Sequence, residues 1–296
     1  MAGYLFVHFT GEHANGEQVY FSISKDGLHW EDIGNGNPML ISDIGERGVR
    51  DPFIVRDSKR QEFYIIATDL RIEAGKGWEV AQYQGSRNMI IWKSKDLIHW
   101  SEPWSYEMDI EGAGCVWAPE SIYIEGKDRF FVYWASMTKR SGEQEAKQRI
   151  FASYTKDFVH FTKPFVFLEG ENHIIDTTIV YDKDWFYRFS KDECIKTIRM
   201  EKSKALESLD YQSIDSPVLD NLIGVEGPEV YQLPNGSWCL IVDQFATQKG
   251  YLPLITKDLS SGIFEKAEDY DMGLSKKRHG SVLKISDQEY ERLRGY

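Results

Sequence analysis

The chain has 296 residues and a formal net charge of −12, with 42% hydrophobic and 28% charged residues. This balance is typical of a globular protein. Nucleic acids and anionic membranes bind basic surfaces, so the acidic charge predicts neither as a partner. The first residues lack the basic and long apolar regions of a secretion signal, which leads us to expect a cytoplasmic location.

One short phrase recurs along the chain. Each copy follows a run rich in β-branched and aromatic residues, which predicts a strand that ends in a tight turn at the Asp of the phrase. The phrase reads SKDGLHW at 24–30, SKDLIHW at 94–100, TKDFVHF at 155–161 and TKDLSSGIF at 256–264, with a degraded copy, KSKALESLDY, at 202–211. Five copies of one unit indicate a repeat architecture.

Two further series of strand-like runs precede the phrases. The nearer series lies at 4–10, 63–70, 130–136, 185–190 and 238–245, and the farther series lies at 51–56, 118–124, 176–181, 227–233 and 279–285. Each repeat therefore contains four predicted strands: one from each series, one leading into the phrase, and one after it. Four-stranded units repeated around an axis are propeller blades, so the sequence predicts an all-β, five-bladed β-propeller.

The two ends of the chain are complementary. The N-terminus begins with a nearer-series strand, whereas the C-terminus supplies a farther-series strand that nothing follows. We expect the C-terminal inner strand to pair with the N-terminal strands, which would close the ring and remove exposed sheet edges. Residues 1–296 are accordingly predicted to form a single domain.

Acidic residues recur on the predicted inner strands. In a propeller the first strand of each blade lines the central channel, so acids from several blades should converge there. Hydrolysis of a glycosidic bond needs two carboxyl groups, and a third nearby would raise the pKa of the one that donates the proton. Aromatic side chains would stack on the sugar faces. The acids are Asp51, Glu120, Asp176, Glu226 and Glu229, joined by His279, and the aromatics are Trp117, Trp134, Tyr187 and Phe189.

Five motifs in order along the chain resemble those of glycoside hydrolase family 43. They are Arg50-Asp51-Pro52-Phe53, Trp117-Ala118-Pro119-Glu120, Ile175-Asp176-Thr177-Thr178, Val225-Glu226-Gly227-Pro228 and Arg278-His279-Gly280-Ser281. That family comprises five-bladed propeller enzymes that act on arabinose- and xylose-containing glycans, with some galactan enzymes.

The resemblance implies a role for each matched position. Asp51 corresponds to the general base that activates water, Asp176 to the residue that orients the acid and raises its pKa, and Glu226 to the general acid. The reaction would be a single displacement with inversion. His279 corresponds to a residue near the axis that helps hold a calcium or other hydrated cation, while no cofactor is implied for the chemistry itself.

The chain departs from the family pattern at three positions. Arg50 replaces the usual His, Glu120 the usual Asp, and Thr177 the usual Pro. Glu120 is therefore a secondary candidate for a catalytic or substrate-binding role. Asp69 and Arg278 flank the motifs and are expected either to contact substrate hydroxyls or to form structural ion pairs. The remaining predicted substrate-binding residues are Trp117, Trp134 and Phe189.

The favoured function is an exo-acting α-L-arabinofuranosidase whose partner is an oligosaccharide or polysaccharide. A β-xylosidase, a galactan-active hydrolase and a non-catalytic glycan-binding propeller remain alternatives. A sialidase is disfavoured because inner-strand acids would repel an anionic sugar, and a fructan enzyme because no Asn-Asp-Pro-Asn motif occurs. The long insert at 71–89 is expected to overhang the mouth of the channel.

Overall fold

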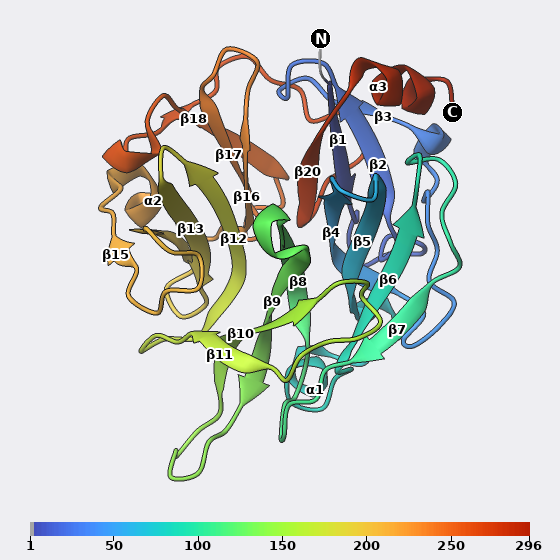
Figure 1. Ribbon diagram of the computed structural model, residues 1–296. Helices are drawn as coiled ribbons and strands as arrows, with labels where there is room; N and C mark the ends of the chain where they lie inside the picture. Colours follow the sequence, from blue (N-terminus) through green and yellow to red (C-terminus); the bar gives the residue numbers. More distant parts are fainter. Residues whose placement is uncertain (1–2) are drawn as a thin grey trace.

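Five antiparallel sheets of four strands each surround a common centre in the computed structural model, which describes residues 3–296. The inner strand of each sheet contacts the inner strands of its two neighbours, so the sheets form a closed ring. Figure 1 shows these inner strands, β4, β8, β12, β16 and β20, gathered around the centre. The predicted all-β, five-bladed β-propeller is confirmed.

The blades follow one another along the chain, and the strands of each blade run in order from the centre of the ring to its rim. Blade 1 contains β20 (Gly280–Ile285), β1 (Gly3–His8), β2 (Tyr20–Ser24) and β3 (Glu31–Asp32). Blade 2 contains β4 (Val49–Asp57), β5 (Glu62–Asp69), β6 (Asn88–Ser94) and β7 (Trp104–Glu107). Blade 3 contains β8 (Trp117–Ile124), β9 (Arg129–Thr138), β10 (Lys147–Thr155) and β11 (Phe165–Leu168). Blade 4 contains β12 (Ile174–Asp182), β13 (Trp185–Asp192), β14 (Thr197–Ser203) and β15 (Gln212–Ser213). Blade 5 contains β16 (Glu226–Gln232), β17 (Trp238–Asp243), β18 (Tyr251–Thr256) and β19 (Glu265–Lys266).

The ring closes within blade 1. Strand β20 pairs antiparallel with β1, in a register that places Leu5 opposite Leu283 and His8 opposite Gly280. The inner strand of this blade thus comes from the C-terminal end of the chain and the other three strands from the N-terminal end. This is the closure that the sequence predicts, and it gives the inner edge of β1 a strand partner.

The structure also contains short helices outside the blades. They are the α-helices α1 (Trp78–Tyr83), α2 (Pro217–Asn221) and α3 (Asp287–Arg294), and the 3₁₀ helices η1 (Gly34–Gly36), η2 (Ile72–Ala74), η3 (Glu125–Lys127) and η4 (Leu259–Ser261). A capping box between Ser286 and Glu289 starts α3, which packs beside blade 1. Within residues 3–296, no helix has the length and apolar character needed to cross a membrane.

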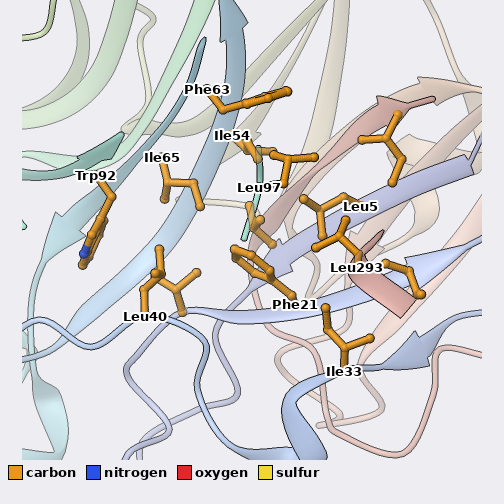
Figure 2. Close-up of a cluster of buried hydrophobic side chains, with 14 of the residues drawn as sticks. Leu5, Phe21, Ile33, Leu40, Ile54, Phe63, Ile65, Trp92, Leu97 and Leu293 are labelled. Carbon is orange, nitrogen blue, oxygen red and sulfur yellow. The ribbon is translucent and has the colours of Figure 1, made fainter. Parts of the chain in front are cut away.

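The hydrophobic core is divided among the blade-to-blade contacts. Five clusters of buried apolar side chains occur in the described part of the chain, and each joins two neighbouring blades. Figure 2 shows the cluster between blades 1 and 2, where Leu5 and Phe21 of one blade lie near Ile54, Phe63 and Ile65 of the other. Burial of these side chains therefore stabilises the ring as a whole, because each sheet supplies half of two cores.

The recurring phrases form the predicted turns. In the first copy a carboxylate oxygen of Asp26 accepts hydrogen bonds from the backbone N–H groups of Leu28 and His29, and the copies at Asp96 and Asp157 repeat the pattern. The Asp side chain thus satisfies backbone donors that no strand partner reaches. The phrase is a structural device for the turn between the third and fourth strands of a blade.

Candidate active site

A β-bulge interrupts the inner strand near its start in blades 2 to 5. At each bulge the pairing register shifts, and one residue adopts a positive φ angle. Bulges re-aim side chains, and a positive φ is costly for residues other than glycine. The bulge residues are Asp51 with φ 52°, Ala118 with φ 46°, Asp176 with φ 47° and Gly227 with φ 52°.

Two of the bulge residues are aspartates that face the same histidine. Nδ1 of His279 lies 3.4 Å from Oδ1 of Asp51 and 3.7 Å from Oδ1 of Asp176. The second oxygen of each carboxylate is also held: Thr68 Oγ1 donates to Asp51 at 2.9 Å, and the Gly227 backbone N–H donates to Asp176 at 3.1 Å. Three blades and the closing strand therefore meet at one point.

Two cations hold Glu226, one residue before the bulge in β16. Lys191 Nζ donates to Oε2 of Glu226 at 2.7 Å, and Arg278 Nη2 donates to Oε1 at 2.9 Å. Arg278 is fixed in turn by Asp243, whose Oδ2 accepts from its Nε at 2.5 Å. Both oxygens of Glu226 thus accept hydrogen bonds from cationic side chains.

These three carboxyl groups line one cavity of about 420 Å³. Trp117 on β8 and Trp78 on α1 form one aromatic wall, with their ring centroids 6.1 Å apart and nearly perpendicular. Phe245, after β17, lies on the cavity wall as well, beneath the ammonium group of Lys191. A cavity of this size, with aromatic walls and convergent polar groups, is suited to a small polar ligand such as a sugar ring.

The surroundings give the three carboxyl groups different protonation tendencies. Burial alone would raise the pKa of Asp51, but the hydrogen-bonded His279 and the charge of Arg50 hold that pKa below its usual value. Burial raises the pKa of Asp176 to about 6, with the Glu226 and Asp51 charges adding to the rise and His279 and Lys191 opposing it. Burial also acts to raise the pKa of Glu226, yet Lys191 and Arg278 outweigh it, so the pKa falls below its usual value.

His279 is cationic in this arrangement. Burial would lower the pKa of its imidazole, but the charges of Asp176 and Asp51 raise that pKa to about 10. A protonated imidazole cannot ligate a metal, and calcium takes oxygen ligands. Among residues 3–296, no group of three or more His, Cys, Asp and Glu side chains is arranged to hold a metal ion. The residues around His279 therefore do not fit the calcium site that the resemblance implies, and the imidazolium bridges the two aspartates instead.

Two aromatic residues expected to bind substrate lie elsewhere. Trp134 on β9 and Phe189 on β13 are both fully buried, in the cores between blades 2 and 3 and between blades 4 and 5. Tyr187 shares the second of these cores. The second strand of a blade is covered by neighbouring blades on both faces, so the alternating side chains along most of its length fill two cores, and in β13 only the end that carries Lys191 reaches the cavity.

Two acidic residues predicted to bind substrate, Asp69 and Glu120, also lie outside the cavity lining, as does Glu229. Asp69 accepts hydrogen bonds from the Glu46 backbone N–H and the Ser86 hydroxyl, and so joins two loops at the end of β5. Glu120 lies two residues past its bulge, is buried, and accepts from the Tyr133 hydroxyl at 2.9 Å. The motif pattern placed Glu120 in register with Asp51, but the bulge makes Ala118 the equivalent residue. The other predicted residues, Trp117 and Arg278, do line the cavity.

Sequence reasoning missed several residues of the cavity wall, among them Lys191, Trp78 and Phe245. Lys191 is buried and charged, and it lies at the mouth end of β13, a strand whose other side chains largely fill a core. A lysine at the end of such a strand is a signal that the sequence contains. Trp78 belongs to the long connection between β5 and β6, for which the sequence predicts an overhang at the mouth but no particular residue. Phe245 gave no signal, because it follows a strand in a segment without a motif.

Comparisons with known proteins find relatives by sequence and by fold. A family described as a probable glycosyl hydrolase domain, related to glycoside hydrolase family 43, matches residues 1–291. An α-L-arabinofuranosidase of Bifidobacterium longum subsp. longum is 27% identical over 270 residues, which is 78% of this chain and 25% of that protein. The chain thus spans about a quarter of the length of this relative.

Solved structures share the fold. A mutant of the family 43 protein BlXynB from Bacillus licheniformis superposes with a TM-score of 0.60 at 18% identity, over 96% of this chain and 55% of that chain. An exo-β-1,3-galactanase from Phanerochaete chrysosporium superposes with a TM-score of 0.53 at 13% identity, over 84% and 53%. At such identities the likeness concerns the five-bladed architecture alone.

Proposed function

The chain belongs to the family of probable glycosyl hydrolase domains related to glycoside hydrolase family 43, and from this we propose that it is an inverting, exo-acting α-L-arabinofuranosidase. One observation carries the proposal: Asp51, Asp176 and Glu226 come from three different blades and line one cavity. The identity with an α-L-arabinofuranosidase favours arabinose over the other pentoses.

The three carboxyl groups divide the proposed chemistry. Asp51 is the general base, because its lowered pKa keeps it ionised and ready to accept a proton from the attacking water. Glu226 is the general acid that protonates the leaving oxygen. Asp176 orients the acid, because its carboxylate accepts a hydrogen bond from the Gly227 N–H, directly after Glu226, and its charge opposes the cations that lower the pKa of Glu226.

The connection between β5 and β6 supports exo action. Helix α1 in this connection adds Trp78 and Gln82 to the cavity wall beside Trp117. A wall on this side narrows the opening, so that a terminal sugar can enter while a continuous chain is obstructed. We therefore expect release of single sugars from chain ends.

A screen of 4-nitrophenyl glycosides tests the activity and the sugar together. The α-L-arabinofuranoside should be hydrolysed fastest among a panel that includes the β-D-xyloside and the β-D-galactoside. Faster hydrolysis of the xyloside or the galactoside would mean that the protein recognises that sugar instead of arabinose, while the proposed hydrolysis would stand. If no glycoside or arabino-oligosaccharide is hydrolysed and glycans still bind, the protein is a binding module and the proposal is wrong.

Proton NMR of the first product formed tests the mechanism. Single displacement gives the β-anomer of arabinose from an α-linked substrate, before mutarotation mixes the two anomers. Initial formation of the α-anomer would show retention and would remove the base role from Asp51.

A further inference from the structure

The proposed reaction needs a proton on Glu226, but the two cations around it hold this group as a carboxylate. Each of its oxygens accepts a hydrogen bond from a cation, Lys191 at Oε2 and Arg278 at Oε1. A protonated acid could not accept both bonds and also donate to a leaving oxygen. Substrate binding must therefore change at least one of these two contacts.

Lys191 also contacts a second carboxylate inside the site. Its side chain is only 2% exposed, and its Nζ lies 2.7 Å from Oε2 of Glu226 and 2.6 Å from Oε2 of Glu193. Glu193 is half-buried in the turn between β13 and β14, lines the cavity, and also pairs with Lys196. One ammonium group thus bridges a carboxylate of the catalytic cluster and a carboxylate of the cavity wall.

Arg278 is held more firmly. Its Nε contacts the fully buried carboxylate of Asp243, and its Nη1 lies 3.7 Å from Glu12. The arginine is therefore tied to strand β17 whatever Glu226 does, which leaves Lys191 as the contact that can change. The charged groups that face Glu226 across the elements packed around it are Lys191 on β13, Arg278 before β20, Asp243 on β17, Asp176 on β12 and Arg50 on β4.

We propose that Lys191 is a positioning residue that controls when Glu226 carries its proton. While it contacts Glu226, Lys191 keeps this group as a carboxylate. When a glycosidic oxygen approaches Oε2, Lys191 withdraws to Glu193, and the buried Glu226 then takes up a hydrogen ion from the solvent and serves as the acid. This inference rests on the proposed hydrolysis, and it assigns to Glu193 the role of an acceptor that holds the displaced lysine.

The burial of Glu226 supplies the driving force for the exchange. Burial disfavours the charged carboxylate, and in the empty site the two cations oppose this effect. Loss of one cation leaves burial and the nearby Asp176 charge to raise the pKa of Glu226. Substitutions of Lys191 and of Glu193 should therefore shift the pKa of Glu226 in opposite directions.

Carboxyl carbon-13 NMR on protein with labelled glutamate measures this pKa directly, with the Glu226 signal assigned by its loss in Glu226→Gln. Lys191→Met should raise the pKa of Glu226 by about one unit or more, which is a tenfold change in its acid dissociation constant. Lys191→Arg should preserve the low value. Glu193→Gln should lower the pKa further, because Lys191 then has Glu226 as its only carboxylate partner in the cavity. Lys93→Met, which removes a lysine paired with Glu62 outside the cavity, is the matched control and should leave the signal unchanged.

The pH profile of kcat/KM provides the second measurement. If Lys191 controls the acid, Lys191→Met should move the alkaline limb to higher pH, because that limb reports the loss of the proton from the acid. An unchanged Glu226 titration in Lys191→Met overturns the inference, whether or not the wild type is active. A wild type inert on every glycoside overturns the proposed function instead, and the NMR titration still decides the role of Lys191.

Discussion

Two groups of buried carboxyls on the inner strands differ in charge. Asp51, Asp176 and Glu226 face the cavity, where His279, Lys191 and Arg278 balance them. Glu120 and Glu229 lie further along their strands, away from the cavity lining. Their bonds come from neutral donors: the Tyr133 hydroxyl for Glu120, and the Thr178 hydroxyl and Val282 N–H for Glu229.

This difference in partners decides the charge of each group. Burial raises the pKa of Glu120 well above its usual value, with the Glu229 charge adding to the rise, and burial raises the pKa of Glu229 to about 8. In the cavity, cations offset the same burial at Asp51 and Glu226. Depth alone therefore does not fix whether a propeller carboxyl is charged. Nearby cations outweigh burial at Asp51 and Glu226, whereas the neutral donors at Glu120 and Glu229 do not.

The largest effect is expected from removing the acid. Glu226→Gln should lower kcat on arabino-oligosaccharides by about 10²–10⁴-fold, the usual contribution of a positioned general acid. The loss should be smaller on 4-nitrophenyl arabinoside, whose leaving group needs little protonation. Steady-state kinetics on both substrates check this, and an equal loss on the two would remove the acid role from Glu226.

In the group formed by Glu120 and Glu229, we expect Glu229 to make the stability of the protein depend on pH. The pKa of Glu229 is raised from 4.5 to about 8 in the folded protein, so its stabilising contribution is full below pH 4.5 and is lost as the pH rises through 8. Glu229→Gln does not titrate and should become more stable than the wild type over this window, by roughly 1–3 kcal/mol at the alkaline end.

Thermal unfolding of both proteins between pH 4.5 and 8.5 measures this difference. The range ends about half a unit above the pKa of Glu229 in the folded protein. Glu268→Gln, at an exposed position in blade 5, is the matched control for loss of one negative charge. A constant difference between Glu229→Gln and the wild type across the range would show that Glu229 is ionised throughout, and the contrast between the two groups would fail.

A smaller effect is expected at the cavity rim. Trp78 is 49% exposed, so Trp78→Ala should leave stability nearly unchanged. It should lower kcat/KM on arabino-oligosaccharides by about tenfold, through loss of a stacking surface. Tyr181→Ala is the control, because Tyr181 is 56% exposed but does not line the cavity. Equal kinetics for Trp78→Ala and the wild type would show that α1 does not contact the substrate.

The smallest effect on activity is expected in the blade core. Trp134 is buried among the side chains between blades 2 and 3, and its indole N–H has no hydrogen-bond partner among the described residues. Trp134→Phe should therefore lower the melting temperature through lost packing and leave KM unchanged. A raised KM at unchanged melting temperature would instead place Trp134 in contact with substrate.

Much of the fold could be predicted because the repeated unit is visible in the amino-acid sequence. The phrases around Asp26, Asp96 and Asp157 mark one turn in three successive blades, and their spacing sets the strand order. The order of strands at the two ends predicted the pairing of β20 with β1. The motifs also identified Asp51, Asp176 and Glu226 as neighbours, since inner strands of a closed ring must meet at its centre.

Prediction failed where position within a strand decided the outcome. Trp134 and Phe189 look like channel aromatics in the sequence, but alternation on a strand covered on both faces turns them into the cores. Glu120 was matched to the wrong position: the bulges in β4 and β8 fall at the same place, so Ala118 corresponds to Asp51 and Glu120 lies two residues further along the strand. Lys191 could not be assigned, because one of its two carboxylate partners, Glu226, lies on a strand of another blade and the other, Glu193, lies in a turn.

The amino-acid sequence alone determined the number of blades, their order and the closure of the ring, because these depend on local strand and turn signals repeated five times. The tertiary structure decided which acids face the cavity and which of them are charged. That outcome depends on the register of each inner strand and on cations brought from distant parts of the chain, and neither is encoded within any single repeat.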